Sequence, residues 1–327
     1  MKFPMTRRAG PTSRRSVITT VLALSMVMAT GVSAQTYPSR PIQVIVPYTA
    51  GGNTDVMARG FLEAMQATTG IAAIVSNRDG AGGTVGFSLL KAAKPDGYTL
   101  VFSPNSPLSS APHLMKSLPF TPADFIPICG VFENIFAIAV APGSRYDSLR
   151  SLMDEARRRP GAVSFGTSGV ASVGHLAGEG FARKVGLTFN HIPFRGEAQM
   201  HAQILGGQID FGLLGMGSAV GVLRPLAIFS DKRLPFLPDV PTTAELGLPN
   251  VPPGYQGLFA PKGTPPEIVA RLSQACEVAT RSAQFAAYGT NNKQKVAYSS
   301  AEKFAVQIAE DSEYKARVIR ELGIKPE

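Results

Sequence analysis

Short apolar segments alternate with helical patterns along most of this sequence, and this alternation restricts the fold more than any other feature. The apolar segment 42–48 is followed by two glycines and then by apolar residues at helical spacing over 54–69, with Gly70 placed to end that helix. The same plan continues with a strand, a helix and a strand, expected at 71–76, 84–93 and 98–102. Strands separated by such helices predict βαβ crossovers and a parallel sheet.

The alternation begins again near residue 140, which indicates a second unit of the same kind. An apolar strand is expected at 134–141, and Pro142-Gly143 ends it. Beyond it the pattern predicts helices at 148–158, 172–185 and 197–205, and strands at 162–166, 188–193, 208–213 and 225–230. Residues 235–253 are rich in proline and are expected to be irregular, apart from a short helix opened by the capping box at 242–245.

The strand expected at 255–260 leads back to the first unit, because the sequence beyond it is mostly helical and cannot build a third sheet. Capping boxes at 264–267 and 299–302 predict helices that run to residues 280 and 322. Two crossings between two α/β lobes form a hinge. We expect one lobe to comprise residues 36–138 plus 255–327 and the other to comprise 139–254.

Residues 1–34 have the pattern of a signal peptide. An uncharged run follows Arg14-Arg15, and Val32-Ser33-Ala34 precedes the expected cleavage before Gln35. The apolar run is too short to span a membrane. Sec export is favoured over the twin-arginine route, to which Ser13-Arg14-Arg15 also points. Removing the five basic residues of this segment lowers the formal net charge from +9 to +4, so the basic excess does not indicate a nucleic-acid partner.

The two cysteines, Cys129 and Cys276, stand 147 residues apart in apolar surroundings. In an oxidising compartment they could form a disulfide, but the sequence does not show that they meet, so a disulfide and two free thiols both stay open. Neither cysteine belongs to a C-x-x-C pair, which argues against a metal or redox site.

Catalytic signatures are incomplete in this chain. Gly166-Thr167-Ser168-Gly169-Val170 has valine where the nucleophile elbow of a serine hydrolase needs its last glycine. The run from Gly80 to Gly86 lacks the last glycine of a dinucleotide loop, and the sequence contains no P-loop. His175 and Glu179 could share a helix face, but no second histidine or cysteine nearby completes a metal site. We expect no enzyme, cofactor or metal, and an exported hydrolase that uses Ser168 is the alternative.

Loops rich in glycine or serine lead from a strand into a helix at four places, 49–54, 80–84, 166–174 and 194–197. Helix N-termini present unpaired N–H groups and a partial positive charge, and glycine lets an anion approach them. Two such loops fall in each lobe, and at the carboxyl ends of parallel strands they would face one crevice. This pattern favours a cleft for a small carboxylated solute. The alternative is that these loops are ordinary turns of an α/β fold.

Two charged residues near these loops each have two interpretations. Arg195 is either a bidentate clamp for a carboxylate or an exposed arginine at a loop tip. Asp210, at the head of a predicted strand, is either a turn residue or an acceptor for a hydroxyl or amine of the ligand.

Motifs at these same loops and along the rest of the chain resemble one family of solute receptors. They are Tyr37 to Ile42, Ile45-Val46-Pro47-Tyr48, Gly51 to Arg59, Asn77-Arg78, Gly80 to Gly83, Pro95 to Leu100, Gly174 to Glu179, His191 to Gly196, Gly206 to Asp210, Leu237 to Thr242 and Ala260 to Pro265. Together they are similar to the substrate-binding proteins of tripartite tricarboxylate transporters, the Bug family of periplasmic receptors. The resemblance covers essentially the whole chain after residue 35.

The resemblance implies an α/β fold of the type II periplasmic-binding-protein kind, in which two lobes close like a Venus flytrap on a small mono- or dicarboxylic acid. It also implies a periplasmic monomer that serves membrane transporter subunits, with a ligand sensor for a signalling ectodomain as the alternative. The contacts carried over by position are Tyr48, Thr49, Ala50, Gly51, Gly52, Thr54, Asp55, Ser103, Asn105, Ser168, Ser172, Phe194, Arg195 and Asp210.

Three features depart from the family pattern. Ala50 stands where the family usually has proline, and Tyr255 stands where an aromatic residue, usually tryptophan, is expected. Between Asp210 and Pro225 the chain is several residues shorter than the family pattern. We therefore expect a truncated helix there, which puts the rear wall of the second lobe in question.

Overall fold

The computed structural model describes residues 1, 4–5, 37–170, 172–234, 236–251, 253–321 and 323–326. The chain divides into a short N-terminal unit, Met1–Ser39, and a folded body, Arg40–Glu327. Apart from Met1, Pro4 and Met5, the predicted signal peptide lies outside the described residues. Within the described ranges, no helix is both long enough and apolar enough to cross a membrane.

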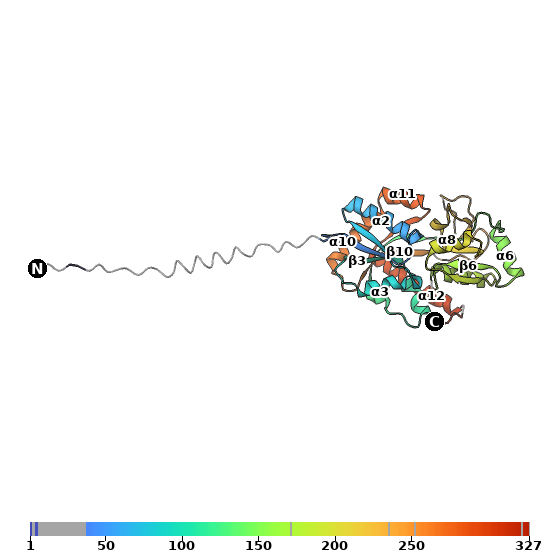
Figure 1. Ribbon diagram of the computed structural model, residues 1–327, viewed down its shortest axis with the longest axis horizontal. Helices are drawn as coiled ribbons and strands as arrows, with labels where there is room; N and C mark the ends of the chain where they lie inside the picture. The colour runs from blue at the N-terminus through green and yellow to red at the C-terminus, as the bar shows by residue number, and fades with distance from the viewer. Residues whose placement is uncertain are drawn as a thin grey trace. The chain divides into compact units, whose positions relative to one another are not determined.

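Among the described residues, six strands form a mixed sheet in one half of the body (Figure 1). Their order is β11-β4-β10-β3-β1-β2, with β1 (Ile42–Val46), β2 (Ala73–Asn77), β3 (Thr99–Pro104), β4 (Phe125–Asn134), β10 (Gly254–Pro261) and β11 (Lys295–Ser299). β2, β1 and β3 run parallel, as the alternating pattern predicts. β10 is antiparallel to both β3 and β4, and β11 is antiparallel to β4. We call this sheet and its helices the first lobe.

The helices of the first lobe connect these strands or follow them. They are α2 (Asn53–Thr69), η1 (Ala81–Gly83), α3 (Thr84–Ala92), α4 (Ser106–Ser109), α5 (Ala111–Leu114), η2 (Pro122–Asp124), α10 (Pro266–Thr280), α11 (Ala283–Asn291) and α12 (Ala301–Glu321). As predicted, Gly70 ends α2 in the left-handed conformation, with φ of 73°, and its N–H donates to the carbonyl of Gln66.

Five strands form a second sheet within the described ranges, in the order β7-β6-β8-β5-β9. They are β5 (Phe136–Val140), β6 (Ser164–Thr167), β7 (Asn190–Pro193), β8 (Phe211–Gly215) and β9 (Arg224–Ile228). β7, β6 and β8 are parallel, whereas β5 is antiparallel to β8 and β9. With helices α6 (Leu149–Arg158), α7 (Val173–Lys184), α8 (Glu197–Leu205) and α9 (Met216–Ala219), this sheet forms the second lobe.

Each sheet has its own apolar core. In the first lobe the ring of Phe87 packs edge-on against Phe125 and Phe259, at 5.0 and 5.2 Å between centroids. In the second lobe Phe165 stacks on Phe211 at 5.6 Å. A disulfide between Cys129 and Cys276 joins β4 to α10, which settles the pairing that the sequence left open.

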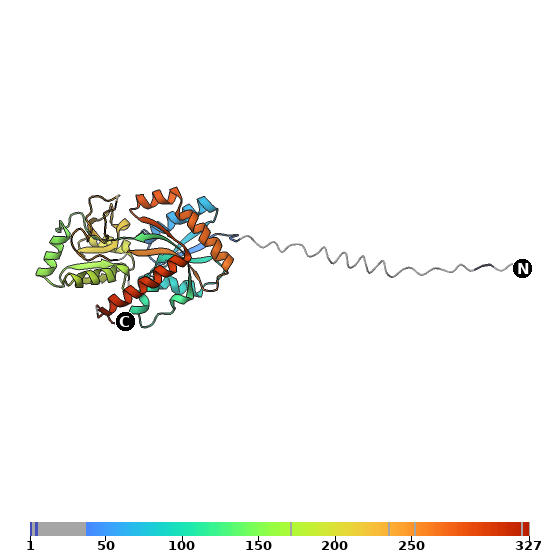
Figure 2. The same ribbon diagram turned by 180° about the vertical axis from the view of Figure 1, so that it is seen from behind.

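The chain crosses between the two sheets twice. β4 of the first sheet continues through Ile135 into β5 of the second, and the segment after β9 returns to β10. Two α/β lobes joined by two segments are therefore the architecture that the sequence predicts. Figure 2 shows α12, in dark red, extending from the first lobe toward the second, where Ile319 packs against Leu176 of α7.

Several predicted elements differ from the structure. The strand expected at 134–141 is two strands, because Asn134 completes β4 and the chain then changes sheet. α11 and β11 were not predicted; β11 is added at the edge of the first sheet, beside β4. The helix expected after Thr242 is a series of turns, although the reciprocal bonds of the capping box form between Thr242 and Glu245, at 3.0 Å each.

The other two capping boxes do not form at the predicted residues. The hydroxyl of Thr264 donates to the carbonyl of Pro261 (2.8 Å), so α10 begins without a side-chain cap. The cap of α12 is Ser300, which accepts from the N–H of Lys303 (3.3 Å), one residue later than expected. Between β8 and β9 the described helix α9 has four residues, Met216–Ala219, and the truncation relative to the family stays a prediction.

Candidate functional site

Loops at the carboxyl ends of the parallel strands meet between the two lobes. They follow β1 and β3 of the first sheet and β6, β7 and β8 of the second, which is the edge where open α/β sheets bind ligands. These loops enclose a cavity of about 20 Å³, which has room for about one water molecule. Its walls are formed by Tyr48, Gly52, Asn53, Thr54, Pro104, Ser106, Asn134, Phe136, Ser168, Ser172, Val173, Glu197 and Gly254. We call it the loop cavity.

Five of the predicted contact residues line the loop cavity, namely Tyr48, Gly52, Thr54, Ser168 and Ser172. They come from both lobes, so the structure brings the predicted loops together. Ser172 is the N-cap of α7 and accepts from the N–H of His175 (3.2 Å).

Tyr48 also shapes the neighbouring loop. Its hydroxyl donates to the carbonyl of Gly82 (2.9 Å), which lies in η1. Burial raises the pKa of this tyrosine above its ordinary value, so the phenol is neutral at physiological pH.

Other predicted residues of the first lobe lie near the cavity without lining it. Asp55 is 3% exposed and accepts from the Gly51 N–H (2.9 Å), from Arg59 (2.9 Å) and from Asn77 (2.8 Å). Although burial acts to raise the pKa of Asp55, these hydrogen bonds lower it below the ordinary value. Asp55 therefore holds the glycine loop in shape, while Ala50 and Gly51 are exposed.

Three further predicted residues of the first lobe lie beside the cavity; Ser103 and Asn105 are buried, and Thr49 is partly buried. The side chain of Thr49 faces Gly196 of the second lobe, and its hydroxyl has no partner among the described residues. The hydroxyl of Ser103 donates to the carbonyl of Pro104 (2.9 Å). The amide of Asn105 donates to Asp311 of α12 (2.7 Å).

In the second lobe, the structure does not bring Phe194, Arg195 or Asp210 to the loop cavity. Phe194 packs against the core of its own lobe, and Arg195 is exposed. Asp210 lies at the opposite end of β8, where its carboxylate accepts from the N–H and the hydroxyl of Ser164 (2.9 and 3.0 Å). It has the role of a structural turn residue at that end of the sheet.

A buried polar cluster that joins the lobes was not predicted from the sequence. The N–H of Asn53 in α2 donates to Glu197 of α8 (3.4 Å), and its side-chain amide donates to Asn134 (2.9 Å). Gln294 in turn donates to the side-chain carbonyl of Asn53 (2.7 Å). The sequence features that could have pointed to these residues were weak, because Asn53 lies inside a glycine motif and Glu197 resembles any glutamate at the first position of a helix. The other missed lining residues are Pro104, Ser106, Phe136, Val173 and Gly254.

Two histidines lie side by side near the second-lobe loops. The rings of His175 in α7 and His191 in β7 stack at 4.1 Å, and Nε2 of His191 is 2.8 Å from the hydroxyl of Thr167. Burial lowers the pKa of His175 to about 4 and that of His191 to about 3, so both rings are neutral at pH 7. Within the described ranges no cluster of three or more histidine, cysteine, aspartate or glutamate residues could hold a metal ion.

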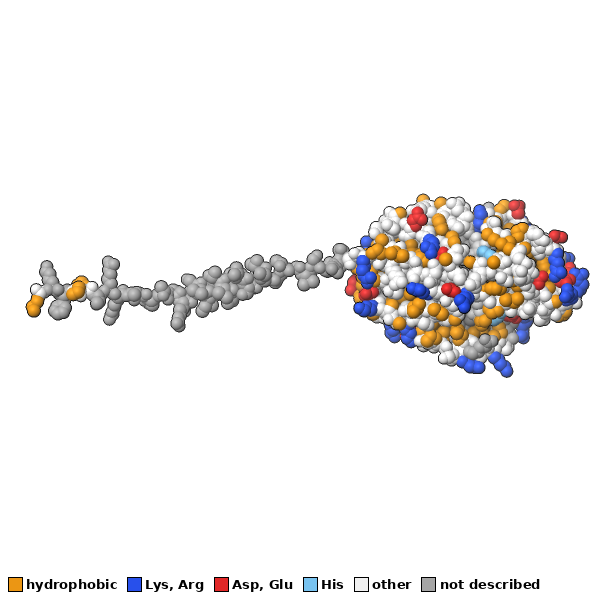
Figure 3. Space-filling model, in the orientation of Figure 1, with side chains coloured by type: hydrophobic (Ala, Val, Ile, Leu, Met, Phe, Trp, Pro, Cys, Tyr) orange, Lys and Arg blue, Asp and Glu red, His pale blue; other side chains and the backbone are white. Residues whose placement is uncertain are grey.

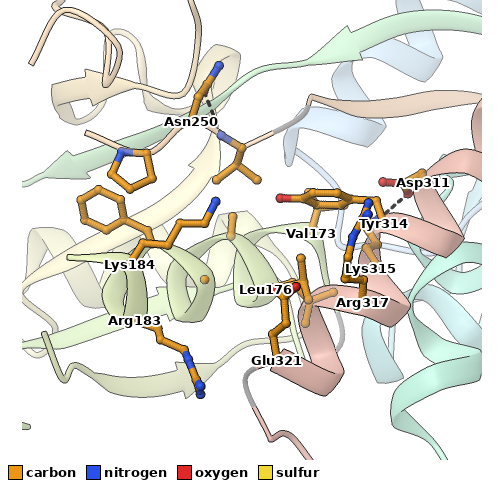
Figure 4. A pocket seen from close by; sticks show the side chains of 16 residues that line it. Val173, Leu176, Arg183, Lys184, Asn250, Asp311, Tyr314, Lys315, Arg317 and Glu321 are labelled. Carbon is orange, nitrogen blue, oxygen red and sulfur yellow. Dashed lines mark hydrogen bonds and ion pairs between the residues drawn. The ribbon is translucent and has the colours of Figure 1, made fainter. Parts of the chain in front are cut away.

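A larger pocket of about 390 Å³ lies between α7 and α12 and shares Val173 with the loop cavity (Figure 4). Its lining is mostly apolar, and Lys184 points into it whereas Arg183 points to the other side of α7. We call it the α7–α12 pocket.

Basic side chains form no continuous surface on the face seen in Figure 3, because acidic and apolar side chains lie among them. The arginines of α6 illustrate this arrangement. Arg157 pairs with Asp154 (2.7 Å) and Arg158 pairs with Glu155 (2.8 Å).

The two lobes, their two connecting segments and the loop cavity between them define a solute-binding protein of the periplasmic type. Residues 57–324 match the sequence pattern of the tripartite tricarboxylate transporter family receptor, and the chain belongs to that family. Protein BugT of Bordetella pertussis is 36% identical over 306 residues, which cover 91% of this chain and 94% of that protein.

Solved structures support the same class. The structure of R. palustris Rpa4515 with adipate is similar with a TM-score of 0.85 and 26% identity, over 89% of this chain and 100% of that one. MatC from Rhodopseudomonas palustris with bound malate has a TM-score of 0.80 and 27% identity, over 86% of this chain and 100% of that one. The family is one of solute-binding receptors, which agrees with the resemblance seen in the sequence.

Proposed function

We propose that this protein is a periplasmic receptor that captures a small mono- or dicarboxylic acid in the loop cavity for a tripartite tricarboxylate-type transporter. The observation that carries this proposal is that loops from both lobes enclose one polar cavity. Ser168, Ser172 and the N-terminus of α7 are the groups we assign to a carboxylate of the ligand. The first N–H groups of a helix have no partner within it, and they favour anions. The adipate of the Rpa4515 structure and the malate of the MatC structure support this ligand class.

The proposal includes the export and organisation of the chain. Residues 1–34 would be removed as a signal peptide, with Sec as the favoured route, and the mature receptor would be a monomer. The lobes would comprise residues 36–138 plus 255–327 and residues 139–254.

A thermal-shift screen of organic acids tests the ligand class. An acid present at 100 times its dissociation constant stabilises the folded state by about 2.7 kcal/mol and raises Tm measurably. We expect small carboxylic acids to raise Tm. Stabilisation by sugars or amines alone, with no active acid, would contradict the proposal.

Two variants separate the loop cavity from the α7–α12 pocket. Ser168→Ala removes a hydroxyl from the loop cavity and should weaken binding of the active acid about tenfold, since a hydrogen bond to a charged group contributes about 1.5–3 kcal/mol. Lys184→Gln removes a cation that points into the α7–α12 pocket and should leave affinity unchanged. Weaker binding in Lys184→Gln together with unchanged binding in Ser168→Ala would place the acid in the α7–α12 pocket. Turnover of a bound ester that Ser168→Ala abolishes would identify a hydrolase instead.

A further inference from the structure

Glu197 is the only charged side chain among the described residues that line the loop cavity. It is the first residue of α8 and is 9% exposed. No lysine or arginine lines the described walls, so the one full charge on the cavity wall is negative. This is unexpected for a cavity that we assign to carboxylates.

The carboxylate of Glu197 already occupies hydrogen-bond donors that an anion would use. Its Oε1 accepts from the N–H of Gly215 (2.7 Å), and its Oε2 accepts from the hydroxyl of Ser218 (2.5 Å). Oε2 also accepts from the N–H of Asn53, the first residue of α2, which belongs to the first lobe. Glu197 therefore occupies two backbone N–H groups at helix starts, that of Asn53 in α2 and that of Gly215, the N-cap residue of α9.

This arrangement gives the cavity wall two unequal groups of polar residues. A ligand carboxylate beside Ser168 and Ser172 meets hydroxyls and the N-terminus of α7. A second carboxylate that reaches Glu197 would be repelled by it, and would find the N–H groups of Asn53 and Gly215 already bonded. Like charges repel each other strongly where water is excluded. Burying a carboxylate that has no hydrogen-bond donors also costs free energy of binding.

We propose that Glu197 determines specificity by excluding a second carboxylate, so that this receptor binds a monocarboxylate whose far end is a hydrogen-bond donor, such as a carboxamide, hydroxyl or ammonium group. The proposal rests on the function proposed above and narrows its ligand class. Discrimination comes from a repulsive group in the cavity rather than from a new attractive contact.

Matched pairs of acids test this inference by calorimetry. Succinate is compared with succinamate, glutarate with glutaramate, and adipate with adipamate, because each pair differs only in one carboxylate replaced by a carboxamide of nearly equal size. For any other diacid that raises Tm in the screen, its monoamide is added. We expect the wild-type protein to bind the monoamide at least tenfold more tightly than the diacid of the same length.

Glu197→Gln removes the negative charge and keeps the side chain's size, so it should reduce that preference at least tenfold by tightening diacid binding. Glu267→Gln removes the same charge from the exposed face of α10 and should leave the preference unchanged. Wild-type binding of a diacid as tight as that of its monoamide overturns the inference, whether or not Glu197→Gln folds. An unchanged preference in folded Glu197→Gln also overturns it, as does an equal shift in both variants. If no acid or monoamide binds at all, the proposed function itself fails.

Discussion

Asn53 contacts three other segments of the chain, although it is a single small residue. Its backbone N–H reaches Glu197 of the second lobe, and its side chain bonds to Asn134 and Gln294. All four residues are buried, so each hydrogen bond replaces water that the polar groups have lost. Gly217 of α9 packs against the same cluster, because a Cβ atom there would clash with Gln294 and with the carbonyl of Asn292.

Gly217→Ala tests whether the lobes must approach this closely to bind. The added methyl group would push α9 away from Asn292, so we expect acid affinity to fall about tenfold while the separate lobes stay folded. Calorimetry with the active acid measures the affinity, and circular dichroism checks the fold.

Gly143→Ala is the matched control, because a Cβ atom at Gly143 meets no other atom within 4 Å. It should bind like the wild-type protein. Undiminished affinity in Gly217→Ala would mean that close contact at α9 is not required for binding.

At the scale of elements, α7 serves both the core and the candidate site. Its first turn, capped by Ser172, faces the loop cavity, and the buried residues Leu176, Ala177 and Phe181 pack along the rest of the helix. The same helix carries His175, whose ring stacks on His191 of β7. A helix held by packing along its length presents its N-terminal N–H groups in a fixed direction.

The neutral histidines predict a loss of stability in mild acid. An unfolded histidine binds a proton as pH falls through about 6.5, whereas folded His175 and His191 stay neutral down to about 4 and about 3. As pH falls from 6.5 to 4, the free energy of unfolding therefore decreases by up to about 1.4 kcal/mol per pH unit for each histidine. Urea unfolding at pH 7 and pH 5 measures the free energy.

His175→Gln should reduce this dependence on pH, because one fewer ring must stay neutral when folded. The pKa of Glu179 on the same helix is raised by burial, which acts in the opposite direction, so comparing the variant with the wild-type protein isolates the histidine. An equal loss of stability in both proteins would contradict this account.

At the scale of the whole body, loops of the two lobes are in direct contact. Gly82 and Thr49 of the first lobe lie against Val170 and Gly196 of the second. A cavity of about 20 Å³ has no room for a four-carbon diacid while the loops keep these positions. Entry of a ligand therefore requires the lobes to separate at the two connecting segments.

Small-angle scattering tests this motion. We expect the radius of gyration of the mature protein to decrease when a saturating active acid is added, because the ligand stabilises the form in which both lobes touch it. Gly217→Ala, which opposes closure, should show a smaller decrease. An unchanged radius alongside binding measured by calorimetry would indicate that one lobe binds alone.

Local sequence patterns predicted the strands and helices at the start of the first lobe. Apolar segments and helical spacing located β1, α2 and β3, because strand and helix periodicity depend on neighbouring residues. Glycine and serine loops between them pointed to the edge of the sheets that lines the cavity. The same reasoning failed at β11, a short edge strand of five residues that is stabilised by pairing with a distant part of the chain.

Short-range periodicity and loop composition were enough to predict the two α/β units, their two connecting segments and the loops at the cavity, and the resemblance to the receptor family located five of the cavity residues. Which distant groups meet depends on the complete tertiary structure. The disulfide joins cysteines 147 residues apart, and the N–H of Asn53 reaches a carboxylate 144 residues away. Such contacts follow from the packing of complete lobes, so no local pattern distinguishes Glu197 from any other glutamate at the start of a helix. Asp210 stands at the start of β8, as the sequence indicates, but only the finished sheet shows that the loop cavity lies beyond the other end of that strand.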